Sequence, residues 1–213
     1  MQNQQNKFEI LRMPPANTNS ILVSSGGDAA IFDPWGRVDD WGRVLDARGL
    51  NLRAIYATHG HPDHISAAPG LAEKYSVPWY MATADNELIG WGGELLDYFG
   101  IPRICTHCVH PVSIDTGRHM LLDAIPMDVI AAPGHTPGGL CFHFPREKIL
   151  ITGDTLFRDG YGRYDFPGGD RRVLFDSISR LHNMNLPDDT YVVHGHGPDS
   201  TIDILRRENP YFR

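Results

Sequence analysis

The chain has 213 residues, of which 41% are hydrophobic and 21% are charged, with a formal net charge of −7. This length and composition are typical of a soluble globular protein, so we predict a single domain over residues 1–213. The negative charge and the lack of a basic run argue against binding to nucleic acid, because that affinity depends on clustered Lys and Arg.

The sequence also bears on the cellular compartment. Its polar N-terminus lacks the apolar core of a signal peptide, and no later stretch is long and apolar enough to cross a membrane. The three cysteines are an odd number, which does not resemble a disulfide framework and agrees with a reducing compartment. We therefore expect a cytoplasmic protein with no membrane partner.

Hydrophobic patterning in the first half predicts strands that alternate with helices. The expected strands are Phe8–Met13, Ile21–Ser24, Ala29–Phe32, Leu52–Ala57 and Val77–Met81. The expected helices are Val38–Arg48, Ile65–Tyr75 and a helix that Asp85 caps and that runs to Phe99. Residues 100–118 show no clear period and are interpreted as a long surface connection, a kind of segment that is often functional.

The second half predicts a second group of strands followed by helices. The expected strands are Met120–Leu122, Met127–Ala132, Leu140–Phe144, Ile149–Thr152 and Thr190–Val193, and the expected helices are Asp170–Met184 and Thr201–Arg207. Because strands come in blocks before and after helices, the pattern favours an α/β fold of two stacked sheets with helices outside over one doubly wound parallel sheet.

The segment from Thr58 to His64 holds three imidazoles and a carboxylate, directly after a predicted buried strand. In an extended backbone His59 and His61 point to the same side, so both rings can bind one metal ion. Asp63 and His64 follow where a helix begins and can face a second ion. The alternative is a solvated polar turn, but clustered histidines at this spacing are more often metal ligands.

Three further positions carry ligand chemistry after predicted strands. His135 lies between two Pro/Gly turns, Asp154 ends an apolar strand, and His196 lies in a glycine loop. Alone, each has an ordinary interpretation as a surface histidine, a turn residue or a loop residue. His194, two residues before His196, is interpreted as a supporting or surface group.

Together these residues make two adjacent metal groups. The first is His59, His61 and His135; the second is Asp63, His64 and His196; Asp154 would lie between them and bridge two ions. This donor set suits zinc first, with iron or manganese as alternatives. Two divalent ions would hold a bridging hydroxide aimed at an electrophilic carbonyl, and Asp63 would act as a catalytic group that orients the hydroxide and carries its proton.

The order and spacing of these ligands resemble the metallo-β-lactamase superfamily, from about Phe8 to Tyr211. The stretches Gly153-Asp154-Thr155-Leu156-Phe157 and Gly195-His196-Gly197-Pro198 resemble the short glyoxalase II-like hydrolases. The resemblance implies an αββα four-layer sandwich, and hydrolysis of a small-molecule thioester such as S-lactoylglutathione. It also implies that the C-terminal helical extension which binds glutathione in longer relatives is absent here.

Two features leave the identity of the substrate open. Arg163 matches a basic residue of glyoxalase II and can bind a substrate carboxylate, or it can form a structural ion pair with Asp165 or Asp170. The neighbouring tyrosine of that family is replaced by Asp165, so glutathione recognition stays open. The aromatics Trp35, Trp79, Trp91, Tyr98 and Phe99 can line an apolar pocket, but core packing is the better interpretation for most of them.

Two alternatives to a thioesterase remain. The run Gly162-Arg163-Tyr164-Asp165-Phe166 also resembles persulfide dioxygenases, which use one iron on two histidines and an aspartate. A metal-binding module without turnover is disfavoured, because a structural ion prefers a closed four-ligand cage. Cys105 and Cys108, with His107 and His110, can bind a further zinc or respond to oxidants, but a single Cys pair is a weak signal.

Overall fold

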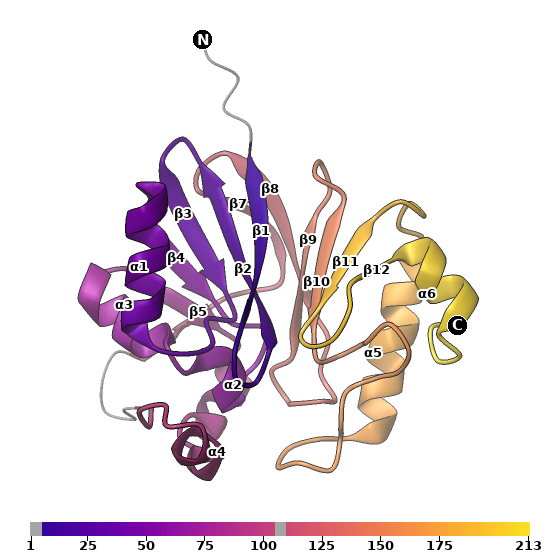
Figure 1. Cartoon of the computed structure of the whole chain (residues 1–213). Helices are drawn as coiled ribbons and strands as arrows, with labels where there is room; N and C mark the ends of the chain where they lie inside the picture. Colours follow the sequence, from indigo (N-terminus) through magenta and orange to yellow (C-terminus); the bar gives the residue numbers. More distant parts are fainter. Residues whose placement is uncertain (1–5, 105–109) are drawn as a thin grey trace.

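The structure is a computed structural model, which describes residues 6–104 and 110–213. Its strands form two six-stranded sheets that stack against each other (Figure 1). The first sheet has the order β1 (Lys7–Met13), β2 (Thr18–Ser25), β3 (Asp28–Phe32), β4 (Asn51–Tyr56), β5 (Trp79–Met81), β6 (Val112–Ser113). The second has the order β12 (Ser200–Thr201), β11 (Tyr191–His194), β10 (Ile149–Gly153), β9 (Leu140–Phe144), β8 (Ile125–Ala131), β7 (Gly117–Leu121).

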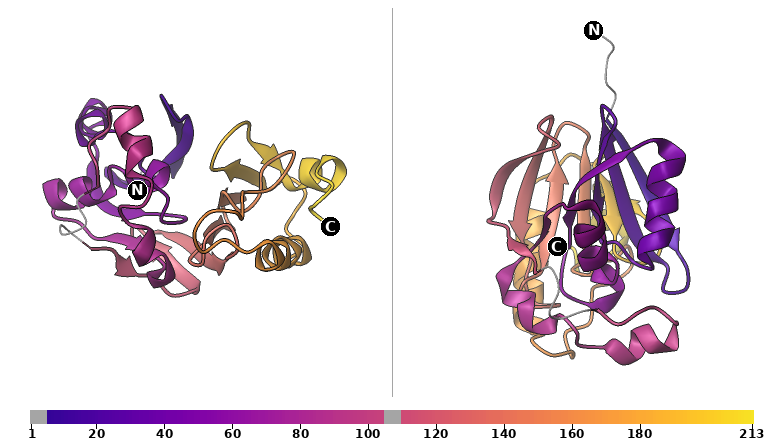
Figure 2. Two further views of the ribbon diagram at one scale, coloured as in Figure 1. Left: turned by 90° about the horizontal axis from the view of Figure 1, so that it is seen from below. Right: turned by 90° about the vertical axis from the view of Figure 1, so that its left-hand side faces the viewer.

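Helices cover the outer face of each sheet, so the predicted αββα sandwich is confirmed (Figures 1 and 2). The helices α1 (Val38–Arg48) and α3 (Ala68–Tyr75) lie outside the first sheet, and α5 (Arg171–Asn183) and α6 (Ile202–Glu208) lie outside the second. The short helices α2 (Pro62–Ile65) and α4 (Gly93–Tyr98) and the 3₁₀ helix η1 (Thr83–Leu88) belong to the connections after β4 and β5.

Three apolar clusters hold these four layers together. Between the sheets, the rings of Phe32 and Phe142 meet edge to face with centroids 5.0 Å apart. Trp41 of α1 is buried against the first sheet, and Leu174 and Ile178 of α5 are buried against the second. Each layer buries its apolar face against its neighbour, which is what makes stacked sheets stable.

Two predicted helices are shorter than expected. The predicted helix Ile65–Tyr75 begins only at Ala68, as α3, and Ile65 is the last residue of α2. Pro69 lacks an N–H and is accommodated only in the first turn of a helix, so a new helix starts there. The predicted helix from Asp85 to Phe99 is wrong: its residues form η1 and then α4. Gly90 and Gly92, with φ of 90° and 69°, interrupt it, because positive φ ends a right-handed helix.

The region 100–118 is also more structured than expected. It contains β6 and the start of β7, which begins three residues before the predicted strand Met120–Leu122. The short strand β12 was not predicted, because a two-residue strand carries no periodic signal. The pair Cys105 and Cys108, with His107, lies outside the described residues.

Candidate metal centre

The predicted ligands come from the ends of strands in both sheets and meet at one edge of the sandwich. The loop after β4 joins the second sheet through a hydrogen bond from the Leu140 N–H to the Thr58 carbonyl, 2.8 Å. The parallel strands β10 and β11 deliver the loops of Asp154 and His196 side by side, and the Gly195 N–H donates to the Gly153 carbonyl at 2.8 Å. A Cβ on Gly195 would collide with Asp154, so glycine is required there.

The three histidines of the first group converge as predicted. Nδ1 of His61 lies 3.1 Å from Nε2 of His59 and 2.9 Å from Nε2 of His135, and all three side chains are buried. Two of the three outward nitrogens have partners: Nδ1 of His135 donates to the carbonyl of Arg163 at 2.6 Å, and Nδ1 of His59 lies 3.0 Å from Oγ1 of Thr58. Nε2 of His61 is buried and makes no hydrogen bond. Such partners fix the orientation of a ligand ring.

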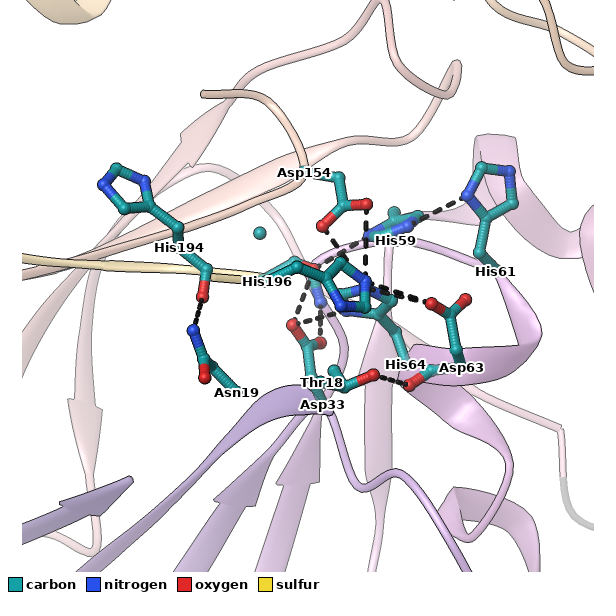
Figure 3. Close-up of polar contacts among 12 residues, drawn as sticks. Thr18, Asn19, Asp33, His59, His61, Asp63, His64, Asp154, His194 and His196 are labelled. Atoms are coloured by element: carbon teal, nitrogen blue, oxygen red, sulfur yellow. Dashed lines mark hydrogen bonds and ion pairs between the residues drawn. The ribbon is translucent and has the colours of Figure 1, made fainter. Parts of the chain in front are cut away.

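The second group also comes together (Figure 3). Nε2 of His196 lies 3.1 Å from Oδ2 of Asp63 and 3.3 Å from Nε2 of His64. On the other side of its ring, Nδ1 of His64 lies 2.9 Å from Oδ2 of Asp33. These three residues and the three of the first group are each arranged so that they can hold an ion.

Asp154 lies between the two groups, as predicted from its sequence position. Its carboxylate oxygens are 3.4 Å from Nε2 of His64 and 3.7 Å from the Nε2 atoms of His135 and His196. Oδ1 is buried and makes no hydrogen bond. A buried carboxylate oxygen without a donor is costly unless a cation satisfies it, so this residue fits a metal centre.

The two groups differ in their electrostatics. Burial lowers the pKa of His59 well below its usual value, and burial together with His135 lowers the pKa of His61 to about 4. Burial alone would also lower the pKa of His64, but Asp33, Asp154 and Asp63 outweigh it and raise that pKa. His59 and His61 therefore present neutral nitrogens, which is the ligand form of a histidine, whereas the carboxylates around His64 favour positive charge at the second group, whether a proton or a metal ion.

Sequence reasoning missed Asp33, which directly follows the predicted strand Ala29–Phe32. It is buried, and its Oδ1 accepts a hydrogen bond from the Thr58 N–H at 2.7 Å. Its Oδ2 accepts from Oγ1 of Thr58 at 2.8 Å and lies beside His64. One carboxylate therefore supports the second group directly, and the first through Thr58 and His59.

Asp85 was predicted to cap a helix, but its side chain joins the two loops of the first group. Oδ2 accepts hydrogen bonds from the Gly60 N–H at 2.9 Å and from Oγ1 of Thr136 at 2.8 Å. Oδ1 accepts from the Gly138 N–H at 2.5 Å. A Cβ on Gly138 would lie 2.7 Å from this carboxylate, so the close contact requires glycine. No local pattern indicates this role.

The start of β2 supports the second group from the first sheet (Figure 3). Oγ1 of Thr18 donates to the carbonyl of Asp63 at 2.9 Å. Nδ2 of Asn19 donates to the carbonyls of His194 and Gly197, at 2.9 and 3.0 Å, and so holds both sides of the His196 loop. The ring of His194 itself is buried and contacts the Leu156 carbonyl and Oγ of Ser200, which agrees with a supporting role.

A cavity of about 400 Å³ opens onto the centre, and Arg163 lines it. Arg163 also forms the predicted ion pair with Asp165, with hydrogen bonds of 2.9 and 2.8 Å. Asp170 is not its partner, because that carboxylate accepts from the Val173 N–H and caps α5. Of the aromatics singled out in the sequence, Trp35 and Trp79 are buried in the core, whereas Trp91 lines the cavity.

Comparison with known proteins agrees with this architecture. The chain is 35% identical over 207 residues to hydroxyacylglutathione hydrolase GloC of Haemophilus influenzae, covering 96% of this chain and 97% of that protein. Among solved structures, the BLEG-1 B3 metallo-beta-lactamase superposes with a TM-score of 0.85 at 28% identity, covering 97% and 99% of the two chains. The structure of TTHA1623 in a di-iron-bound form superposes with a TM-score of 0.83 at 32% identity, covering 95% of this chain and 99% of that chain.

A third structure, ETHE1 of Myxococcus xanthus, superposes with a TM-score of 0.76 at 26% identity, covering 96% of this chain and 83% of that chain.

Within the described residues, none of the helices is long and apolar enough to span a membrane. The sequence profile of the Metallo-beta-lactamase superfamily matches residues 13–196. The chain therefore belongs to the metallo-beta-lactamase superfamily.

Proposed function

We propose that this protein is a metal-dependent hydrolase that cleaves thioesters such as S-lactoylglutathione. The observation that carries the proposal is the position of Asp154, whose carboxylate lies within 3.7 Å of ring nitrogens from both ligand groups. A relative named hydroxyacylglutathione hydrolase, similar over nearly the whole chain, supports the thioester as substrate. Two divalent ions, zinc first and iron or manganese as alternatives, would supply a water of lowered pKa and polarise the carbonyl group.

The residues of this chain would then act as follows. His59, His61 and His135 would hold one ion, Asp63, His64 and His196 would hold the other, and Asp154 is placed to serve both groups. In hydrolysis, the water oxygen bonds to the carbonyl carbon, the C–S bond breaks with its electron pair on sulfur, and the thiolate takes up one proton.

Asp63 is the residue proposed to orient the water and carry that proton. Its carboxylate faces the cavity beside His196. Burial raises the pKa of Asp63, but His64 and His196 outweigh this and hold it below its usual value, so the group is an ionised acceptor at neutral pH. Arg163 lines the cavity, and we propose that it contacts the substrate through the guanidinium N–H groups that do not bond to Asp165.

The second candidate is a persulfide dioxygenase with one iron, proposed because residues 162–166 resemble that family; the structural likeness to ETHE1, at 26% identity, adds little support. The deciding experiment combines metal analysis of the purified protein with two assays: hydrolysis of S-lactoylglutathione and oxygen uptake with glutathione persulfide. About two ions per chain with thioester cleavage is the expected result. One iron with oxygen uptake and no hydrolysis would overturn the proposal and make Asp63, His64 and His196 supporting residues.

A further inference from the structure

The cavity above the candidate centre has a polar base and an apolar wall. Four predicted ligands form the base: His61, Asp63, His135 and Asp154. Six apolar or aromatic residues form most of the wall: Pro62, Trp91, Leu95, Phe157, Tyr161 and Phe166. Apolar walls with a few fixed polar groups are typical of small-molecule sites, where the wall contacts the unreactive part of the ligand.

The aromatic part of this wall stands directly against a predicted ligand. The ring centroid of Trp91 lies 5.3 Å from that of His61 and 5.2 Å from that of Phe166. Phe166 lies 5.5 Å from His61, with the two rings nearly perpendicular. A group attached to a carbonyl at the centre would therefore meet two ring surfaces at once.

The wall presents no unpaired charge. Arg163 is the one Lys or Arg among the described residues that line this cavity, and both of its bonds to the Asp165 carboxylate are shorter than 3.0 Å. Its guanidinium also lies 4.1 Å from the ring centroid of Phe166, so its face is covered by an aromatic ring. Because this solvent-exposed guanidinium already bonds to a carboxylate, it attracts a charged substrate group less than an unpaired Arg would.

A second hollow, of about 370 Å³, lies on the His196 side of the centre. It shares Phe157 and Tyr161 with the first cavity, but Arg158, Asp159 and the turn Gly197-Pro198 also line it. Outside the predicted ligands, the first space is therefore lined mainly by apolar and aromatic side chains, and the second also by the charged side chains of Arg158 and Asp159. Both spaces border the same centre, as the two sides of a thioester flank its carbonyl.

We propose that the cavity of Trp91 and Phe166 binds the acyl group, and that the preferred substrates carry a compact, uncharged aromatic or branched acyl group. The polar thiol part then occupies the hollow at His196. This inference rests on the proposed thioester hydrolysis. The inference goes beyond that function because it assigns the two sides of the substrate. It also makes lactoyl, which is small and hydroxylated, a substrate group that is cleaved but less favoured than an apolar acyl group.

The test uses four thioesters: phenylacetyl and lactoyl esters of N-acetylcysteamine, and the same two acyl groups on glutathione. With the metal-loaded protein, kcat/KM is expected to favour phenylacetyl by about tenfold or more with either thiol, because apolar contacts of this size discriminate at that level. Trp91→Ala and Phe166→Leu should each reduce this preference severalfold. Tyr98→Ala is the matched control, since Tyr98 is 82% exposed and outside the cavity.

Three outcomes would overturn the inference. Equal or higher kcat/KM for lactoyl leaves the proposed function intact but removes the acyl assignment. If kcat/KM depends on the thiol and not on the acyl group, the assignment of acyl group and thiol to the two cavities must be exchanged. No cleavage of any of the four thioesters by metal-loaded protein overturns the proposed function itself. Unfolding midpoints of the variants show whether a lost preference comes from the wall or from a damaged fold.

Discussion

Oδ2 of Asp33 lies 2.9 Å from Nδ1 of His64, and both side chains are almost completely buried. Asp33 is thus the partner that orients the second group, although its position in the sequence shows only that it follows β3. In Asp33→Asn, a side-chain NH₂ replaces one of two acceptor oxygens and faces a donor. We expect affinity for the second ion to fall by about 10–100-fold, the usual effect of such partners.

Metal titration of Asp33→Asn, read as ions bound per chain, measures this effect. Asp39→Asn is the control, because its carboxylate is 82% exposed. Wild-type affinity at both groups in Asp33→Asn would show that the contact does not orient His64.

Asp85→Ala is expected to loosen the first group. It leaves three buried donors without an acceptor, from Gly60, Thr136 and Gly138. The free energy of unfolding should fall by about 1–3 kcal/mol, and affinity for the first ion by about 10–100-fold. Thr136→Val, which removes one of the three bonds, should cause a smaller loss. Equal loss from both groups in a metal titration would indicate general damage and not a role at the first group.

Asp154→Ala should empty or weaken both groups, because this carboxylate is the residue that contacts both. Elemental analysis after removal of free metal should show both ions reduced, whereas Asp63→Ala should reduce the second alone. Loss of a single ion from Asp154→Ala would contradict the bridging position.

Asp63→Ala should cost turnover more than it costs folding. If Asp63 orients the water and carries its proton, kcat with a thioester should fall by about 10²–10⁴-fold, while the unfolding midpoint changes little. The rate is to be expressed per bound ion. A variant that loses metal but keeps full activity per remaining ion would show that the mechanism is wrong.

Cys141 gives a pH dependence that is separate from the ligand groups. Burial raises the pKa of its thiol to about 12, whereas an unfolded Cys ionises near its ordinary value of about 8.5. The protonated Cys141 thiol therefore makes its full contribution to the free energy of unfolding below about pH 8.5. Above this pH the unfolded state loses a proton that the folded state retains, so the free energy of unfolding falls, by about 2 kcal/mol at pH 10.

Denaturant unfolding at pH 7 and pH 10 measures this change, and Cys141→Ala should show a correspondingly smaller fall. As a second measurement, the peptide that contains Cys141 should resist iodoacetamide at pH 8.5 in the folded protein and react after unfolding. Rapid alkylation in the folded state would contradict the buried, neutral thiol.

The sequence by itself determined the stacked α/β sheets and the seven residues that gather at the centre. Those residues carry local signals, since each is a His or Asp in a segment that follows an apolar strand and contains Gly or Pro. The helix of residues 85–99 was predicted wrongly for a related reason: its apolar spacing is local, and the backbone that Gly90 and Gly92 adopt is not visible in that spacing.

Only the tertiary structure decided which residues hold the centre in place and which shape the cavity. Asp33 and His64 are 31 residues apart, and Asp85 and Gly138 are 53 apart, so no periodicity links them. Likewise, Trp79 is buried in the core and Trp91 lines the cavity, although both are tryptophans in the same short stretch of sequence. Their roles depend on which segments pack together, and packing between distant segments is a property of the folded chain alone.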